Sequence, residues 1–343
     1  MSAGETRRIR FDELAALLAD IFAAHGCSRE AAEALGSNMA TAEQDGALSH
    51  GIFRIDAYVA TLRSGWVDGR AVPEVEDVAP GQVRVNANNG FTLPATAAAR
   101  DLFVSKARQT GIATLLVRNS HHFSALWPDV EPFAREGFVA MSMVNSMATV
   151  VPFGGREPVY GTDPLAFAAP REGGDPLVFD MATSTMSNGD VQIAAREGVQ
   201  LPPGSGVDAN GQPTTDPDAV LNGGALLTFG GYKGSAIAMM IEIMGAALTG
   251  GKFSFEVDWS EHEGAATPHT GQFILIIDPS RGATRPFAQR VETLIGRLRM
   301  AGVERLPGER RYATRSRNLA EGIPIAAAEL ERLKALALGH VTS

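Results

Sequence analysis

The order of hydrophobic patterns along the chain restricts its fold more than any other feature. Apolar residues recur at helical spacing near the N-terminus, from Phe11 and Leu14 onward, and again in residues 285–301 and 325–338. Apolar runs of strand length fill the middle of the chain: Ile112–Val117, Val139–Val144, Leu165–Ala169, Leu177–Phe179 and Phe273–Ile277. No regular crossover helices separate these runs, so a regular βαβ parallel sheet does not fit. We therefore predict an α/β fold with a mixed, largely antiparallel sheet flanked by helices.

The same change of pattern divides the chain of 343 residues into regions. We expect residues 1–75 to form an N-terminal helical segment that packs with C-terminal helices in residues 285–343. Residues 76–284 are expected to form a mixed α/β region. Within the first region, Ser28 is a suitable N-cap for a helix that runs to about Gln44.

Composition and charge narrow the class of protein. The net charge is −9, which argues against nucleic acid or an anionic membrane as the main partner. The one cysteine, Cys27, excludes an intramolecular disulfide, as is usual for a cytoplasmic protein. The first residues show no signal-peptide pattern. The most apolar stretch, residues 235–250, is short and contains Glu242, so we expect no membrane span.

The segment SHGIFR at residues 49–54 holds the first candidate site residues. If Ser49 caps a helix, His50, Arg54 and Tyr58 share a face away from the apolar stripe of that helix. A histidine that carries a proton, beside an arginine that binds a carboxylate, is typical of an active site. An ordinary helix cap with a solvated polar face is the alternative. A hydrolytic Ser49–His50 pair is not expected, because adjacent helical residues diverge by about 100°.

Three further motifs each allow two interpretations. The paired histidines in NSHHFS, residues 119–124, lack the spacing of a metal site, so a loop that lines a ligand site is favoured. The glycine-rich GGYKGS, residues 230–235, lacks the Walker spacing and is either a phosphate-binding turn or a simple turn. Arg305, Arg310 and Arg311 form either a phosphate clamp or a solvated loop. No glycine turn has the context of a Rossmann fingerprint, since the glycines at 204 and 206 follow Leu-Pro-Pro.

Taken together and in this order, the motifs resemble the malate/L-lactate dehydrogenase type 2 family of nicotinamide oxidoreductases, which do not use a Rossmann fold. The matching segments lie between about residue 45 and residue 251: SHGIFRIDAY, NSHHFSAL, VVPFGGREPVYGTDPLAFAAP, FDMATS and FGGYKGSAIAMMIE. Three more segments resemble one branch of this family: GVDANGQPTTDPDAVLNGGALL, FEVDWSEHEGAATPHTGQ and RLPGERRY. That branch reduces the cyclic imino acids Δ1-piperideine-2-carboxylate and Δ1-pyrroline-2-carboxylate to L-pipecolate or L-proline with NADPH.

The resemblance implies a role for each matched residue. His50 would be the proton donor, with Ser49 and Asp190 as a relay that holds and polarises it. Arg54 would bind the substrate carboxylate, with Thr162 beside it. The residues that would hold NADPH are His122, Phe123, Ser124, Ala125, Leu126, Asp180, Met181, Ala182, Tyr232, Lys233, Pro307, Gly308, Glu309, Arg310 and Arg311. The resemblance also implies a homodimer, and no metal ion is expected.

Two other functions stay open at this level. A dehydrogenase of 2-hydroxy acids such as malate or lactate would use the same histidine and arginine, since a ketone oxygen also needs a proton. A protein that binds NADPH without turnover is the more distant alternative. Activity on a cyclic imine, compared with an open-chain 2-oxo acid, separates the three.

Overall fold

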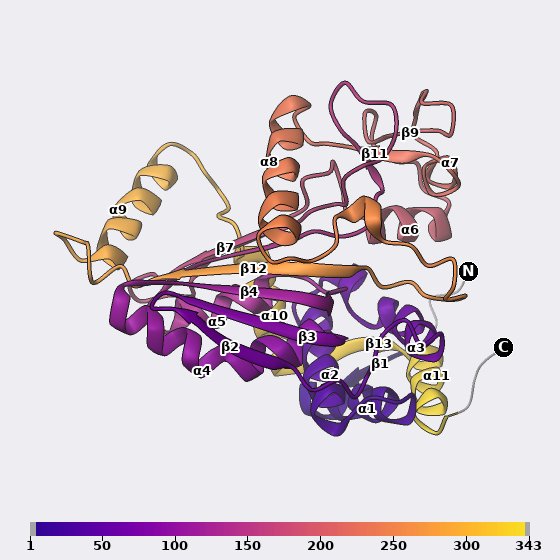
Figure 1. Cartoon of the computed structure of the whole chain (residues 1–343), viewed down its shortest axis with the longest axis horizontal. Coiled ribbons are helices and arrows are strands. Elements are labelled where there is room, and N and C mark those ends of the chain that lie inside the picture. The colour runs from indigo at the N-terminus through magenta and orange to yellow at the C-terminus, as the bar shows by residue number, and fades with distance from the viewer. Residues whose placement is uncertain (1–4, 340–343) are drawn as a thin grey trace.

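A computed structural model describes residues 5–339 and has a seven-stranded sheet at its centre (Figure 1). The strands lie in the order β2 (Glu74–Ala79), β3 (Gln82–Phe91), β4 (Ile112–His121), β12 (His269–Ile277), β5 (Val139–Val144), β7 (Leu165–Ala169) and β8 (Leu177–Met181). Neighbouring strands are antiparallel except for β3 and β4, which are parallel. The predicted mixed, largely antiparallel sheet is therefore confirmed.

Helices cover both faces of this sheet. On one face, α4 (Thr92–Thr110) and α5 (Trp127–Arg135) bury the main core, in which Phe103 and Phe133 meet edge to face. On the other face lies α8 (Tyr232–Glu242), which continues into a π-helical turn, Ile243–Ala247. Gly271 of β12 allows this turn to approach, because a Cβ there would lie 1.9 Å from the carbonyl oxygen of Gly245.

The two ends of the chain meet in one helical unit. It contains α1 (Phe11–Ala24), α2 (Arg29–Gln44), α3 (Ile55–Arg63) and α11 (Ala327–Ala337). The first strand, β1 (Thr6–Ile9), pairs antiparallel with the last, β13 (Ile323–Ala326). α10 (Glu309–Glu321) runs beside α2, whereas α9 (Phe287–Met300) lies at the far end of the sheet in Figure 1. The domain limits given above remain a prediction.

A third, smaller unit stands above the sheet in Figure 1. Its four strands lie in the order β10 (Pro213–Thr214), β9 (Gly206–Val207), β11 (Ala225–Leu227) and β6 (Val150–Val151). The helices α6 (Asn188–Glu197) and α7 (Pro217–Leu221) pack around the same small core. This unit brings Asn188–Glu197 to the helical unit, since α6 contacts the turn that holds Ser49 and His50.

Two local expectations need correction. The chain after Ala47 forms two 3₁₀ turns, Leu48–His50 and Ile52–Arg54, before α3 begins at Ile55. Arg54 and Tyr58 are buried, although a helix beginning at Ser49 would have kept them outside the core. Tyr58 packs against the rings of Phe22, Phe91 and Phe123, because the 3₁₀ turns rotate the following helix relative to a continuous one.

The helices α5 and α10 were not expected from the sequence. α10 buries only Asn318 among its residues, so it lacks the apolar stripe by which helices are recognised. Among residues 5–339, no helix is long and apolar enough to cross a membrane.

Candidate active site

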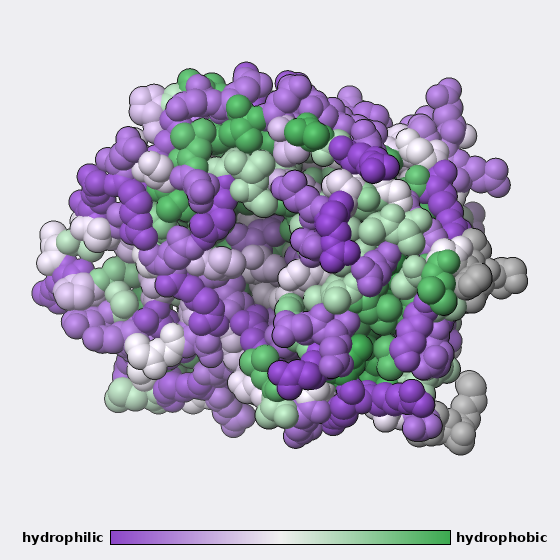
Figure 2. Space-filling model, turned by 90° about the horizontal axis from the view of Figure 1, so that it is seen from below, coloured by the Kyte–Doolittle hydropathy of each residue, from purple (hydrophilic) through white to green (hydrophobic). Residues whose placement is uncertain are grey.

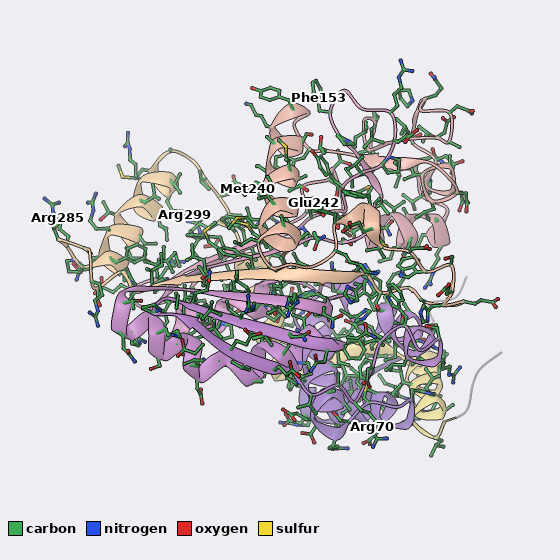
Figure 3. The ribbon with its side chains drawn as sticks, in the orientation of Figure 1. Arg70, Phe153, Met240, Glu242, Arg285 and Arg299 are labelled. Atoms are coloured by element: carbon green, nitrogen blue, oxygen red, sulfur yellow. The ribbon has the colours of Figure 1, made fainter. Side chains whose placement is uncertain are left out.

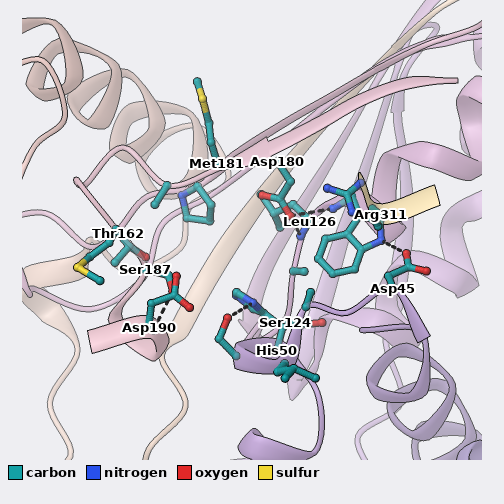
Figure 4. A pocket seen from close by; sticks show the side chains of 18 of the residues that line it. Asp45, His50, Ser124, Leu126, Thr162, Asp180, Met181, Ser187, Asp190 and Arg311 are labelled. Carbon is teal, nitrogen blue, oxygen red and sulfur yellow. Dashed lines mark hydrogen bonds between the residues drawn. The ribbon is translucent and has the colours of Figure 1, made fainter. Parts of the chain in front are cut away.

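A cavity of about 1100 Å³ lies where the helical unit, the β8 edge of the sheet and the small unit meet. Its wall comes from five stretches of the chain: residues 45–54, 122–127, 144–147, 162–193 and 305–317. Figure 4 shows Asp190 and Thr162 across the cavity from His50 and Arg311. The surface seen from below the view of Figure 1 is mostly hydrophilic and is hollowed near its centre (Figure 2).

His50 lies half-buried in the cavity wall, on the first 3₁₀ turn. Its Nδ1 is 3.2 Å from the Ser49 hydroxyl oxygen (Figure 4). A hydroxyl that donates to Nδ1 leaves the ring hydrogen on Nε2. Desolvation, and then the charge of Arg54 nearby, lower the pKa of His50 to about 3. His50 is therefore neutral at pH 7.

Ser49 and His50 are in contact, so the angle between adjacent residues was the wrong reason to discount a hydrolytic pair, although the contact does not contradict that expectation itself. The angle between adjacent Cβ directions does not fix the distance between Oγ and Nδ1, because each of these atoms lies beyond Cβ and turns about it. The contact joins a hydroxyl to the side of the ring that faces away from the free Nε2.

Arg54 is a buried cation at the same wall. It is 5% exposed, its Nε donates to the carbonyl oxygen of Ser49 at 2.7 Å, and its guanidinium carbon lies 4.1 Å from the centre of the Phe123 ring. Burial lowers the pKa of Arg54 to about 10, so the group stays charged at neutral pH. No carboxylate in the described part of the chain forms an ion pair with it. A buried guanidinium with free donors is suited to bind the carboxylate of a ligand.

Gly189 makes room for Arg54 at the start of α6. A Cβ at Gly189 would lie 2.6 Å from the Arg54 Nη2 and 3.2 Å from the Ser49 carbonyl oxygen. The next residue, Asp190, lines the cavity with an exposed side chain, and its charge favours the ionised form of Arg54. Its backbone N–H donates to the capping hydroxyl of Ser187 at 3.0 Å. The expected relay from Asp190 through Ser49 remains a prediction.

The loop after β4, residues 122–126, is fixed at its start by Asp129 and at its end by Asp180. The Nε2 of His122 lies 3.0 Å from Asp129 Oδ2, which also accepts from Gln272 at 2.7 Å. Asp180 accepts from the backbone N–H groups of Leu126 and Trp127, at 2.7 and 3.0 Å, at the start of α5. Burial raises the pKa of Asp180, although these two N–H groups oppose the shift. Asp180 thus fixes the helix that bounds the cavity.

Arginines line the opposite rim of the cavity. The guanidinium of Arg311 stacks 4.3 Å from the ring of Trp127, and its Nη1 is buried without a hydrogen-bond partner in the described part of the chain. The expected Arg305 and Arg310 also line the rim, and the structure adds Arg317. Arg310, Thr314 and Arg317 lie at i, i+4 and i+7, which is one face of α10.

The structure brings most of the expected site residues to one cavity. Those that line it are Ser49, His50, Arg54, His122, Phe123, Ser124, Ala125, Leu126, Thr162, Asp180, Met181, Ala182, Asp190, Pro307, Gly308, Arg310 and Arg311. Tyr232, Lys233 and Glu309 are not in its wall. Tyr232 is exposed beside Phe153, and Glu309 accepts from the N–H of Leu306 and pairs with Arg299.

Sequence reasoning missed several lining residues, including Asp45, Trp127, Asn145, Ser187 and Arg317. The arginine spacing in residues 310–317 would have revealed a helical face, had that segment been treated as a helix. In residues 5–339, no three His, Cys, Asp or Glu side chains are arranged to hold a metal ion.

Known proteins similar to this chain are named as dehydrogenases or reductases. A sequence profile described as malate/L-lactate dehydrogenase matches residues 9–334. The Delta(1)-pyrroline-2-carboxylate/Delta(1)-piperideine-2-carboxylate reductase of Pseudomonas syringae pv. tomato is 60% identical, over 98% of this chain and 97% of that protein. The crystal structure of delta1-piperideine-2-carboxylate reductase from the same organism superimposes with a TM-score of 0.95 at 59% identity, covering 96% of this chain and 99% of that one. The (2R)-3-sulfolactate dehydrogenase (NADP(+)) of Chromohalobacter salexigens is 38% identical, over 98% of this chain and all of that protein.

We predict that Arg54→Met folds as well as the wild type or better, because it removes a buried charge that has no ion-pair partner. A small carboxylate that binds in the cavity should lose a charge-assisted contact worth about 1.5–3 kcal/mol. Thermal melting with and without the carboxylate measures both effects. Arg196→Met is the matched control, since Arg196 stacks on Phe53 at 4.4 Å but does not line the cavity. A carboxylate that stabilises Arg54→Met as strongly as wild type would remove Arg54 from the binding site.

Proposed function

This chain belongs to the malate/L-lactate dehydrogenase family, and we propose that it reduces cyclic imino acids that carry a carboxylate next to the C=N bond. The observation that carries the proposal is the buried, unpaired guanidinium of Arg54 beside His50 in one cavity. The substrate class follows the reductases to which the chain is about 60% identical, which are named for Δ1-pyrroline-2-carboxylate and Δ1-piperideine-2-carboxylate.

The cavity places a positive charge where the carboxylate of such a substrate could bind. Arg54 would hold the carboxylate, and Thr162 lies across the cavity from His50 (Figure 4). A fixed carboxylate orients the attached ring, and such orientation contributes several kcal/mol to catalysis, within the ~7–11 kcal/mol available from positioning. Gly189 keeps the guanidinium in place because any side chain there would displace it.

We propose a nicotinamide cofactor and, more narrowly, NADPH. The rim fits the 2′-phosphate of that cofactor, since Arg311 has a buried Nη1 without a partner and Arg305, Arg310 and Arg317 stand beside it. When bound, the reduced nicotinamide supplies the hydride for the C=N carbon. Asp180 and the start of α5 would fix the loop from His122 to Leu126 against it.

The protein's part of the chemistry is to deliver a proton to the ring nitrogen. The pKa of His50 is about 3, largely through desolvation and then the charge of Arg54. A substrate carboxylate that pairs with Arg54 offsets that charge, so binding raises the pKa of His50. His50 would then take up a proton with the substrate and give it to the imine nitrogen, while Ser49 holds Nδ1.

An assay of NADPH oxidation tests this function. The purified protein should act on Δ1-piperideine-2-carboxylate and Δ1-pyrroline-2-carboxylate in preference to pyruvate, oxaloacetate and 3-sulfopyruvate. His50→Ala should lower kcat about 10²-fold or more, the usual contribution of a general acid, while NADPH binding survives. Preference for an open-chain 2-oxo acid would instead identify a hydroxyacid dehydrogenase, the activity for which the sulfolactate relative is named. Binding of NADPH without turnover of any of these compounds would contradict both enzymatic functions.

The second test concerns the cofactor. Replacing Arg310 and Arg311 together by Ala should weaken NADPH binding about 10- to 150-fold, the equivalent of a lost charge-assisted contact of ~1.5–3 kcal/mol. NADH lacks the phosphate and should bind nearly unchanged. Calorimetric titration of both cofactors measures this. Arg290→Ala, on the distant α9, is the control. Equal losses for the two cofactors would show that these arginines do not read the phosphate.

We further propose a cytoplasmic homodimer that forms through α8. Large apolar side chains stay exposed along the side of this helix and its π-helical continuation that faces away from the sheet: Met239, Met240, Ile243 and Leu248. Figure 3 shows Met240 on the outer side of α8. Such a patch on a soluble protein is usually covered by a partner, and a second copy is the simplest one. The cytoplasm fits a reductase that consumes NADPH.

Light scattering should give twice the chain mass of 36.2 kDa. The double variant Met240→Glu/Ile243→Glu should give the monomer, because it places charge in the apolar contact. Leu319→Glu changes an equally exposed leucine on α10 and should remain dimeric. A wild-type protein with the mass of one chain at micromolar concentration would rule the dimer out.

A further inference from the structure

Two buried carboxyl groups lie outside the proposed chemistry but next to the cavity wall. Asp163 is fully buried, between Thr162 and Pro164, which line the cavity. Glu242 is 5% exposed and is the last residue of α8 before the π-helical turn. Figure 3 shows it at the end of α8 that meets β12. Neither carboxyl forms an ion pair with a cation in residues 5–339, which is unusual for buried acids.

The two carboxyl groups converge on the same donors. The hydroxyl of Ser254 accepts from the N–H of Ser146 at 3.1 Å, so its hydrogen is free for Asp163 Oδ1 at 3.5 Å. The backbone N–H of Ser254 donates to Glu242 Oε2 at 3.2 Å. Gly161 lies against Asp163, since a Cβ there would lie only 2.6 Å from Asp163 Oδ1, and its backbone opposes the rise in pKa of both carboxyls. Contact with the same residue, Ser254, brings the two groups near each other.

One oxygen of each group has no donor among residues 5–339. Asp163 Oδ2 and Glu242 Oε1 are both buried without a hydrogen-bond partner in that part of the chain. Two ionised carboxylates would leave both oxygens unsatisfied and would repel each other, whereas a single proton between them satisfies both. We propose that Asp163 and Glu242 share one proton and that this pair positions the cavity wall for the imine reduction proposed above, on which the positioning role rests.

The surrounding charges agree with a shared proton. Burial, followed by the charge of Glu242, raises the pKa of Asp163 well above its ordinary value, and burial also raises the pKa of Glu242. Other charged groups nearby point elsewhere. The Lys252 ammonium lies 5.4 Å from the centre of the Trp66 ring, Glu256 accepts from the N–H of Phe253, and His269 contacts Asn119.

The pair joins three elements that carry the site. Asn145, fully buried at the end of β5, donates to Glu242 Oε2 at 3.3 Å and to the carbonyl oxygen of Lys252 at 2.7 Å. Asn145, Ser146 and Thr162 all line the cavity. α8 begins at Tyr232 and Lys233, the expected cofactor contacts. Loss of the shared proton would separate Thr162 from α8 and so move one wall of the cavity.

Counting the proton tests the pair without any substrate. At neutral pH both carboxyls are ionised in the unfolded chain, since their ordinary pKa values lie near ~4, while the native pair keeps one proton. From about pH 6 to 8 the unfolding equilibrium constant of the wild type should therefore rise about tenfold more per pH unit than that of Asp163→Asn/Glu242→Gln. Stability falls as pH rises through this window because unfolding releases the proton. Urea unfolding at fixed ionic strength measures the difference.

Glu261→Gln changes an exposed glutamate in the neighbouring loop and should behave as wild type. No difference in slope between wild type and the double variant would mean that both groups are ionised, and a hundredfold difference per pH unit would mean that each holds its own proton. Either result overturns the shared proton. An infrared difference spectrum of the folded proteins counts the protonated carboxyls directly, even where the unfolding is irreversible.

The positioning role has a separate readout. Glu242→Ala should raise KM for the imine about tenfold, as expected for the loss of one charge-assisted hydrogen bond, and Glu242→Gln should restore it, because the amide replaces the proton. Unchanged KM in Glu242→Ala would overturn the positioning role. A wild-type protein inactive on every imine would contradict the proposed function instead. The number of protons on the pair would still be tested by the unfolding and infrared measurements, which need no substrate.

Discussion

The interface between the helical unit and the sheet depends on one arginine. Arg315 of α10 forms two hydrogen bonds with Asp45, of 2.7 and 2.6 Å, and two with Glu131 of α5, of 2.6 and 2.9 Å. Asp45 and Glu131 are 4% and 5% exposed, so neither carboxylate has water as an alternative partner. Removing one member of a buried set of this kind leaves an uncompensated charge and costs about 3–5 kcal/mol.

This interface also sets the position of the cavity. Asp45 accepts from the indole N–H of Trp127 at 2.9 Å, and Trp127 supports the guanidinium of Arg311. Three residues after Asp45 begins the turn that carries Ser49 and His50. The side of the cavity that carries His50 and the rim that carries Arg311 are thus both attached to the buried ion pairs of Arg315 with Asp45 and Glu131. On the His50 side, burial acts differently on two neighbours, since it keeps His50 neutral but leaves Arg54 charged at neutral pH.

The sequence predicted those parts of the fold in which periodicity and capping agree. Ser28 caps α2 as expected, by accepting from the N–H of Ala31 at 3.2 Å, and the helix ends at Gln44. The mixed sheet was predicted because its strands are short apolar runs without crossover helices. α10 was missed because it is held by ion pairs and not by an apolar stripe. Tyr58 was assigned to a polar face because hydrophobic periodicity does not reveal a 3₁₀ turn. For the site, the sequence motifs identified many of the residues that line the cavity. The neutral state of His50 could not be predicted, because it results from burial by segments that are distant in the sequence.

The pairing of β1 with β13 has a consequence for how the chain becomes active. Residues 6–9 find their partner only at residues 323–326, so the first strand stays unpaired until those residues have been made. The pairs β2–β3 and β7–β8 join strands that are neighbours along the chain and close short loops, whereas β12 closes the centre of the sheet from much later in the sequence. α1 and α2 pack on each other and can form early, but their shared core is complete only when α11 and β13 have joined it. Because residues 305–317 also line the cavity, its wall is complete only after the sheet and the helical unit have both closed.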